Sequence, residues 1–236
     1  MRIINRLDVK EGFLIKGIQL EGWRKYGDPV KEAQKQYKSG IDEIFVVDVV
    51  ASLYGRNNSF DLLRQIAKNV FVPITLSGGI RTLEDVSNAF WHGADKIGIN
   101  SSATKNSEII SEIANRYGSQ AVVVNVEVKK INNKWFVLIE NGRTHTDWEL
   151  LPWIEEIQKK GAGEIYITSI DKDGTLKGPD LDLINYVQDS IKIPTVYGGG
   201  VSGQEDIKKL QDFNFLSGVS IASGLYKLEK TVDFFR

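Results

Sequence analysis

Short apolar segments rich in β-branched residues alternate along the chain with longer segments of helical periodicity. The strand-like segments are Ile3–Val9, Glu43–Val47, Ile74–Leu76, Lys96–Ile99, Ala121–Val128, Glu164–Thr168, Thr195–Tyr197 and Gly218–Ile221. The helical segments are Pro29–Lys38, Ser59–Lys68, Leu83–His92, Ser107–Arg116, Trp148–Lys160, Leu181–Ser190 and Gln204–Phe213, with a short last helix expected in the tail, Lys227–Arg236. Strand–helix alternation predicts a parallel sheet, and eight repeats predict an α/β fold of the closed (β/α)8 type, the TIM barrel.

An open, doubly wound sheet is the alternative arrangement for such an alternation. That fold usually has fewer strands and a Gly-x-Gly-x-x-Gly turn after its first strand, and this sequence has no such turn after Ile3–Val9. A barrel typically needs roughly 250 residues, and the chain has 236. The sequence has no low-complexity segment and no Pro/Ser-rich linker. We therefore expect residues 1–236 to form one barrel domain.

An internal repeat divides the predicted barrel into two halves. The recurring segments, each pair 121 positions apart, are Glu43-Ile44-Phe45 with Glu164-Ile165-Tyr166, Pro73 with Pro194, Gly78-Gly79 with Gly199-Gly200, and Glu84-Asp85 with Glu205-Asp206. Asp8-Val9-Lys10 matches Glu127-Val128-Lys129 at an offset of 119. A constant offset across strand, turn and helix start indicates a two-fold half-barrel repeat. We expect two similar sites to face each other across the mouth, the end of the barrel where the strands have their C-termini.

Two glycine pairs follow equivalent strands of the two halves, Gly78-Gly79 after the third and Gly199-Gly200 after the seventh. Glycine lets backbone N–H groups approach an anion closely, and a helix N-terminus adds partial positive charge. The residues expected to complete two phosphate sites are Asn100 and Ser101 after the fourth strand, Ala222 and Ser223 after the eighth, and Asp173 and Gly174 after the sixth. Two such sites on one mouth predict an elongated bisphosphate ligand. Glycines that only make tight turns are the alternative.

Asp8 and Glu127 end the first and fifth predicted strands, which lie opposite each other in an eight-stranded barrel. Two carboxylates that flank one substrate can act as general acid and general base if their environments separate their pKa values. Carboxylates at the C-terminal ends of barrel strands usually serve function. The alternative is a structural pair bridged to Lys10, Lys129 or Arg6. Other polar candidates near the strand ends are Lys16, Asp48, Thr168, Ser169 and Asp171.

Charge and composition exclude several other classes of protein. Charged residues make up 26% of the chain and nearly cancel, to a net charge of -1, so no nucleic-acid or membrane-surface partner is indicated. The chain has no cysteine, and the two histidines, His92 and His145, belong to no cluster with metal-ligand spacing. We therefore expect no metal ion and no other cofactor. Neither a signal peptide nor a membrane span is predicted, which favours a cytoplasmic protein.

These motifs together resemble the HisF family, the cyclase subunit of imidazole glycerol phosphate synthase in histidine biosynthesis. The segments that carry the resemblance cover nearly the whole chain and are Leu7-Asp8-Val9-Lys10, Val46-Val47-Asp48, Gly78-Gly79-Ile80-Arg81, Ala94-Asp95-Lys96, Ile99-Asn100, Gly163-Glu164-Ile165, Asp171-Lys172-Asp173-Gly174-Thr175 and Gly199-Gly200. The resemblance implies an enzyme that uses ammonia from a glutaminase. The ammonia would close the imidazole ring of a bisphosphorylated ribulosyl aminoimidazole carboxamide substrate.

The resemblance also implies roles for individual residues. Asp8 would be the essential acid or base, with Glu127 as its partner. Lys16, on a mobile loop after the first strand, would help to close over the substrate, and Thr168 would contact it. One phosphate would be held by Gly79, Asn100 and Ser101, and the other by Asp173, Gly174, Gly199, Gly200, Ala222 and Ser223.

In that family the glutaminase, a HisH-like subunit, docks at the opposite, N-terminal face of the barrel, where a ring of charges admits ammonia. The matching residues here are Arg2, Glu43, Lys96 and Glu164. They start the first, second, fourth and sixth predicted strands, and two cations with two anions are mutually neutralised. A ring that only stabilises the bottom of the barrel is the alternative. Asp95 would lie close to the docked partner.

The chain departs from the family pattern mainly around the mouth. Glu127 replaces the usual aspartate, and one extra methylene can misplace a proton-transfer group by about an ångström. Arg6 stands where a small residue or cysteine is usual, and Gly198 replaces the serine before the second glycine pair. Glu140–Thr146 replaces a smaller loop that carries a lysine, and the chain ends earlier than the family pattern.

Because the departures gather at the mouth while the charged ring is intact, three other functions stay open. A HisF-like paralogue would deliver ammonia for the amidation of a surface sugar. A sister barrel of the same pathway isomerises the preceding intermediate without ammonia, but it has no use for the charged ring. A non-catalytic barrel would only dock and activate a glutaminase, and in that case Asp8 would be dispensable.

Overall fold

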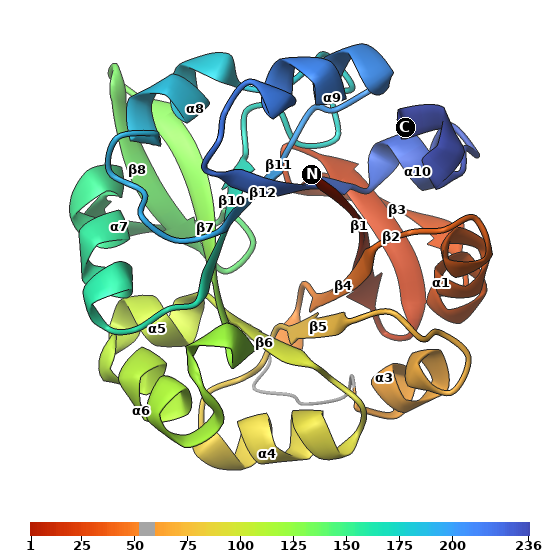
Figure 1. Cartoon of the computed structure of the whole chain (residues 1–236), viewed down its shortest axis with the longest axis horizontal. Helices are drawn as coiled ribbons and strands as arrows, with labels where there is room; N and C mark the ends of the chain where they lie inside the picture. Colours follow the sequence, from red (N-terminus) through yellow and green to blue (C-terminus); the bar gives the residue numbers. More distant parts are fainter. Residues whose placement is uncertain (52–59) are drawn as a thin grey trace.

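A computed structural model describes residues 1–51 and 60–236 and confirms the predicted (β/α)8 barrel. Figure 1 shows the strands as an inner ring surrounded by helices. The barrel strands are β1 (Arg2–Lys10), β4 (Glu43–Asp48), β5 (Ile74–Ser77), β6 (Lys96–Ile99), β7 (Val122–Ile131), β10 (Glu164–Ser169), β11 (Thr195–Gly198) and β12 (Leu216–Ile221). Each pairs in parallel with the next, and β12 pairs with β1 to close the ring.

The helices that cover the barrel lie between successive strands, as predicted. They are α1 (Pro29–Lys38), α3 (Phe60–Ala67), α4 (Leu83–Trp91), α5 (Ser101–Lys105), α6 (Glu108–Tyr117), α7 (Leu150–Lys159), α8 (Leu181–Val187), α9 (Gln204–Gln211) and α10 (Ser223–Tyr226). Ser59, the expected start of the second helix, lies outside the described residues. The prediction of a helix over Lys227–Arg236 was wrong, because α10 ends at Tyr226 and only a 3-10 turn, Val232–Phe235, follows.

Side chains of the barrel strands alternate between the helix layer and the barrel interior, as the period of a strand requires. On β1, Ile3, Leu7 and Val9 pack outward in the main core under the helices. The intervening residues, Arg2, Ile4, Arg6 and Asp8, therefore face the interior. This alternation fixes which residues reach the two ends of the barrel.

Two β-hairpins project above the mouth, and the sequence analysis had missed both. The first, β2 (Phe13–Ile18) with β3 (Glu21–Gly27), follows β1, and the second, β8 (Lys134–Ile139) with β9 (Thr144–Glu149), follows β7. Because β1 and β7 are the first strands of the two halves, the half-barrel repeat includes the hairpins. Trp148 belongs to β9, so α7 begins two residues later than expected.

The two hairpins meet above the barrel. The Asn141 side chain between β8 and β9 donates a hydrogen bond to the Leu20 carbonyl between β2 and β3, over 3.1 Å. Leu20 also packs with Leu138 and Ile170 in a small apolar cluster. The hairpins thus roof the mouth from two sides.

Within residues 1–51 and 60–236, no helix is long and apolar enough to cross a membrane.

Candidate active site

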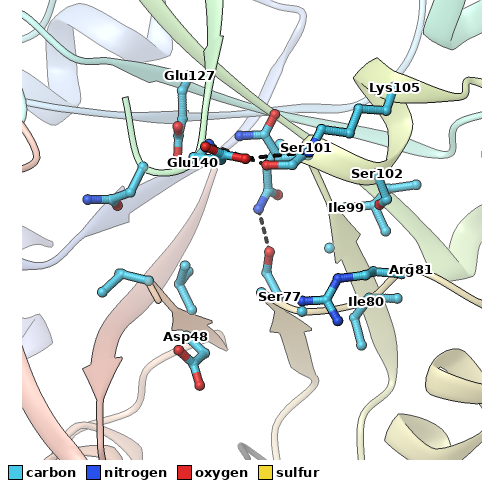
Figure 2. A pocket seen from close by; sticks show the side chains of 18 residues that line it. Asp48, Ser77, Ile80, Arg81, Ile99, Ser101, Ser102, Lys105, Glu127 and Glu140 are labelled. Atoms are coloured by element: carbon cyan, nitrogen blue, oxygen red, sulfur yellow. Dashed lines mark hydrogen bonds and ion pairs between the residues drawn. The ribbon is translucent and has the colours of Figure 1, made fainter. Parts of the chain in front are cut away.

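The first predicted phosphate site is a pocket at the mouth, lined by Gly78, Gly79, Asn100 and Ser101 (Figure 2). Gly78 has φ +95° and Gly79 has φ +77°, a region that glycine tolerates best. A β-carbon on Gly78 would lie 2.2 Å from the Asp48 carbonyl oxygen. The turn therefore needs glycine at this position, as the sequence predicted.

Several polar atoms around this first pocket have no partner within the described chain. They are Asn100 Oδ1, Ser102 Oγ and Asn125 Oδ1, all buried. Asn125 had not been predicted; its amide nitrogen donates to Ser77 Oγ over 2.7 Å. Buried polar groups are normally hydrogen-bonded, so unpaired ones around a pocket indicate that a polar ligand completes the site.

The second pocket lies on the other side of the mouth and repeats the same plan. The predicted residues Asp173, Gly174, Gly199, Gly200, Ala222 and Ser223 line it, together with Arg6 and Tyr166. Gly200 has φ +80°, and a β-carbon there would lie 2.1 Å from the Gly178 carbonyl oxygen. Ser223 Oγ is buried and unpaired within residues 1–51 and 60–236. Both predicted cradles are therefore present as pockets.

Asp8 lies at the end of β1 in a chain of four buried charges. Its Oδ1 accepts a hydrogen bond from Arg6 Nε over 2.6 Å, and its Oδ2 accepts one from Lys16 Nζ over 2.7 Å. Lys16 Nζ also contacts Asp173 Oδ1 over 2.8 Å. The sequence analysis weighed a bridge to Arg6 as an alternative to catalysis. The structure shows that bridge within the mouth, next to the second pocket.

Lys16 was expected on a mobile loop, and this prediction was wrong. It lies within strand β2, and its side chain is 1% exposed because it bridges Asp8 and Asp173. Thr168, at the end of β10, does not face a pocket directly: its Oγ1 accepts from Arg6 Nη1 over 3.2 Å. Lys16 therefore contacts Asp8 from β2, and Thr168 contacts Arg6 from β10.

Glu127 lies within β7, on the opposite side of the barrel from β1, and lines the first pocket. Its Oε2 accepts a hydrogen bond from the Gly142 N–H over 2.8 Å, so the β8–β9 turn holds this carboxyl. Burial raises the pKa of Glu127 to about 7, against the opposing effects of Arg6 and of the Gly142 N–H.

The pKa of Asp8 shifts in the other direction. Burial alone would raise this pKa, but the Arg6 and Lys16 cations outweigh burial and hold it below its ordinary value. The two carboxyl groups therefore differ in protonation near neutral pH: Asp8 is ionised, and Glu127 is partly protonated. Such a separation is what an acid–base pair requires.

The four charged residues at the N-terminal end form the predicted ring. Glu43 Oε2 contacts Arg2 Nη1 over 2.7 Å and Lys96 Nζ over 3.0 Å. Glu164 contacts Lys96 Nζ over 3.0 Å and also pairs with Arg2. Thr75 Oγ1 donates to Glu43 over 2.9 Å. Each anion thus touches both cations, which closes the ring at the bottom of the barrel.

Some polar candidates hydrogen-bond to the backbone, although Asp48 also lines the first pocket. Asp48 Oδ1 accepts from the Val50 and Ala51 N–H groups, and Asp171 Oδ2 accepts from the Lys130 N–H. His92 ends α4, where its ring stacks on Phe60 at 5.2 Å. Asp95 Oδ2 accepts from the Ile74 N–H over 2.8 Å, which ties the starts of β5 and β6 together.

A closed barrel with matched halves and a pocket beside a glycine turn in each half places the protein among the (β/α)8 barrels whose site lies at the mouth. Comparison with known proteins narrows this class. A family model described as "Histidine biosynthesis protein" matches residues 2–231, and the chain belongs to that family. It is an enzyme of the HisF type, as the sequence analysis expected.

Three relatives named "Imidazole glycerol phosphate synthase subunit HisF" illustrate the similarity. The protein of Legionella pneumophila is 46% identical over 215 residues, which are 91% of this chain and 99% of that protein. The protein of Sulfurisphaera tokodaii is 40% identical over 236 residues, covering 99% of this chain and 94% of that protein. The protein of Wolinella succinogenes is 43% identical over 223 residues, covering 94% and 86%.

Proposed function

We propose that this chain is the cyclase subunit of an imidazole glycerol phosphate synthase. It would use ammonia released by a glutaminase to close an imidazole ring on a bisphosphorylated ribulosyl aminoimidazole carboxamide substrate. The observation that carries the proposal is the mouth itself: two opposed glycine cradles with Asp8 and Glu127 between them. No metal ion or other cofactor takes part in the proposal, and we place the enzyme in the cytoplasm.

The two cradles orient the substrate by its two phosphates. Gly79, Asn100 and Ser101 hold one phosphate, and the buried, unpaired Ser102 hydroxyl can donate a further hydrogen bond to the same end of the ligand. The second phosphate is held by Gly174, Gly199, Gly200, Ala222 and Ser223. Fixing both ends leaves the reacting centre between the carboxyl groups, which lowers the entropic part of the barrier.

The carboxyl pair performs the proton transfers that ring closure needs. Addition of ammonia to a carbonyl carbon requires a proton for the carbonyl oxygen and a base for the nitrogen. Glu127, partly protonated at neutral pH, is suited to donate, while the ionised Asp8 is suited to accept. Lys16 and Thr168 keep the Asp8 region in place from β2 and β10.

The N-terminal face is the proposed entrance for ammonia and the docking face of a HisH-like glutaminase. The ring of Arg2, Glu43, Lys96 and Glu164 surrounds the barrel axis there. Large apolar side chains lie exposed in segments that lead into the starts of the strands: Phe71, before β5, is 76% exposed, and Trp91, at the end of α4, is 86% exposed. Exposed apolar residues around a polar entrance are typical of a protein interface.

The decisive experiment supplies the purified chain with the ribulosyl bisphosphate intermediate and an ammonium salt, and follows the ultraviolet absorbance of the substrate. We expect turnover without the glutaminase. Asp8→Asn should lower this turnover by on the order of a hundredfold or more, because it removes a proton-transfer group. Glu155→Gln, an exposed position on α7, is the matched control and should leave it unchanged.

Each other outcome points to a different function. A folded protein without turnover would favour the paralogue that delivers ammonia to a sugar. Normal turnover in Asp8→Asn would overturn the proposed catalytic role, and it would favour a barrel that only docks a glutaminase.

A further inference from the structure

Arg6 is a buried cation in the wall of the second pocket. It precedes Asp8 by two residues on β1, so both side chains face the interior. Its Nε donates to Asp8 Oδ1 over 2.6 Å, its Nη1 donates to Thr168 Oγ1 over 3.2 Å, and its Cζ lies 5.7 Å from the ring centre of Tyr166. The residue is 4% exposed. Three contacts from two strands therefore fix the guanidinium.

The two cations on Asp8 differ in where they come from. Lys16 belongs to a hairpin that roofs the mouth, whereas Arg6 belongs to the barrel strand that carries Asp8 itself. Any movement of this hairpin would carry Lys16 with it. Arg6 would stay with Asp8, because Thr168 and Tyr166 hold it from β10.

We propose that Arg6 is a positioning residue of the reaction: it keeps Asp8 an ionised proton acceptor throughout the cycle and leaves proton donation to Glu127. The inference rests on the proposed function and assigns the direction of proton transfer within it. The positive charge of Arg6 favours the ionised form of both carboxyl groups. Among the groups that lower the pKa of Glu127 against the effect of burial, Arg6 is the strongest.

The groups that face the pair come from every side of the mouth. Asp8 faces Arg6 on its own strand, Lys16 on β2, Asp173 after β10 and Tyr226 on α10. Glu127 faces the Gly142 N–H and feels the charges of Arg6, Asp8 and Asp173. Since Arg6 is common to both sets and is positive, its removal should raise the pKa of both carboxyl groups.

The test is the pH dependence of ammonium-dependent turnover, measured at constant free ammonia for the wild type, Arg6→Met and Arg6→Lys. In Arg6→Met we expect the limb that follows Glu127 to move upward by roughly one pH unit. Arg6→Lys should return it toward the wild-type position. A purely structural role would lower turnover equally at all pH values, and an Arg6→Met profile with an unmoved limb would overturn the proposal.

A carboxyl-carbon NMR titration of Asp8 and Glu127 gives the same readout without activity. It separates failure of this inference from failure of the proposed function, because the titration shifts are measurable in a protein that turns nothing over. If Arg6→Met does not fold, Arg6→Gln retains a polar partner for Thr168, and the same upward shift is expected.

An independent observation concerns the middle of the barrel. Phe45 on β4 and Tyr166 on β10 are stacked, with ring centres 4.4 Å apart and planes 9° apart. In the order of the eight barrel strands, β4 and β10 are diametrically opposite. Two side chains from opposite walls can meet only across the axis. The pair lies one interior layer above Glu43 and Glu164, which precede it by two residues on the same strands.

The two rings extend to the walls of the barrel on both sides. A β-carbon on Gly98 would lie 3.2 Å from the Phe45 ring, and one on Gly198 would lie 3.1 Å from the Tyr166 hydroxyl. That hydroxyl donates to Ser220 Oγ on β12 over 2.5 Å. Ile4, Val123 and Val196 belong to the same buried apolar cluster. The interior is therefore filled between the charged ring and the mouth.

We infer that this aromatic layer is a closed inner gate, which ammonia crosses only when the rings move apart. The inference also rests on the proposed function, because it concerns the route from the N-terminal face to the mouth. Tyr166 is tied to the mouth through Ser220 and Arg6, so rearrangement around a bound substrate can reach the layer.

The test uses the complex with its glutaminase and compares glutamine-dependent with ammonium-dependent turnover. Phe45→Trp thickens the layer and should lower the ratio of the two about tenfold, because free ammonium enters at the mouth and bypasses the gate. Phe45→Leu thins the layer and should raise the ratio. An equal ratio in both variants and the wild type would overturn the gate. Loss of ammonium-dependent turnover in the wild type would instead overturn the proposed function.

Discussion

Asp8 and Glu127 occupy equivalent positions of β1 and β7 at the mouth, yet their surroundings differ in charge. Both oxygens of Asp8 accept from cations, whereas the hydrogen bond that the structure shows for Glu127 comes from a backbone N–H. The sequence predicted both carboxyl groups from their places at strand ends. It offered Arg6 as an alternative ion-pair partner of Asp8, but not Lys16 or the link through it to Asp173, because these residues are brought together only by closure of the barrel and by the first hairpin.

At the scale of this residue, Glu127→Gln should stabilise the protein more at high pH than at low pH. The folded pKa of about 7 lies above the unfolded value of 4.5, so ionisation costs stability as the pH rises through this range. The shift corresponds to about 3 kcal/mol, and the amide avoids this cost. We expect the gain in unfolding free energy to grow by about 2–3 kcal/mol between pH 5 and pH 8 in urea titrations.

The same substitution should lower turnover, since glutamine cannot donate the proton. Glu155→Gln on the exposed face of α7 is a suitable control, and its effect on stability should not depend on pH. A gain in stability for Glu127→Gln that is equal at both pH values would contradict the assigned protonation.

Among the elements, the barrel strands and their helices were predictable and the hairpins were not. The barrel strands are buried on both faces and so read as continuous apolar runs. Strand β3, by contrast, is mostly exposed and has the polar sequence Glu-Gly-Trp-Arg-Lys-Tyr-Gly, which carries no such signal. Strand β2 is short and has a buried cation, Lys16, in an otherwise apolar stretch. The family resemblance had placed this residue on a loop.

The turn between β5 and α4 allows a test at the scale of elements. Gly78→Ala should raise the KM for the bisphosphate substrate about tenfold or more, because a β-carbon there meets the Asp48 carbonyl at 2.2 Å and displaces the cradle. Gly40→Ala is a matched control: its φ is also positive, at +84°, but a β-carbon there meets nothing within 4 Å.

Both substitutions should cost about 1 kcal/mol or more of stability, because alanine is strained at positive φ. Only Gly78→Ala should change the KM. Equal KM values in the two variants, from steady-state kinetics, would show that the turn at Gly78 takes no part in substrate binding.

For the whole molecule, the barrel holds two networks of two cations and two anions, one at each end; the network at the mouth is buried and the ring at the other end is partly exposed. The members of the ring, Arg2, Glu43, Lys96 and Glu164, were expected from the family resemblance, and their places at strand starts and alternating signs agreed with it. The Phe45–Tyr166 layer between the networks was not predicted. A stack across the axis depends on which strands are diametrically opposite, and a local pattern does not encode that.

At this scale, Lys96→Met should lower stability by about 2–3 kcal/mol, because Glu43 and Glu164 are buried and would each lose one partner. Lys208→Met breaks an exposed pair with Glu205 and should leave stability almost unchanged. Lys96→Met should also lower glutamine-dependent turnover while free ammonium still supports the reaction. Equal losses in both assays would limit the ring to a structural role.

The half-barrel repeat, where it is broken, determines the direction in which a ligand binds. Asn125 stands two residues before Glu127, as Arg6 stands two residues before Asp8, so a neutral amide in one half takes the place of a guanidinium in the other. A symmetric cleft would accept a molecule with two similar tails in either direction. The difference between Asn125 in one half and Arg6 in the other makes the two ends of the cleft chemically different. The cleft can therefore distinguish the two ends of its ligand.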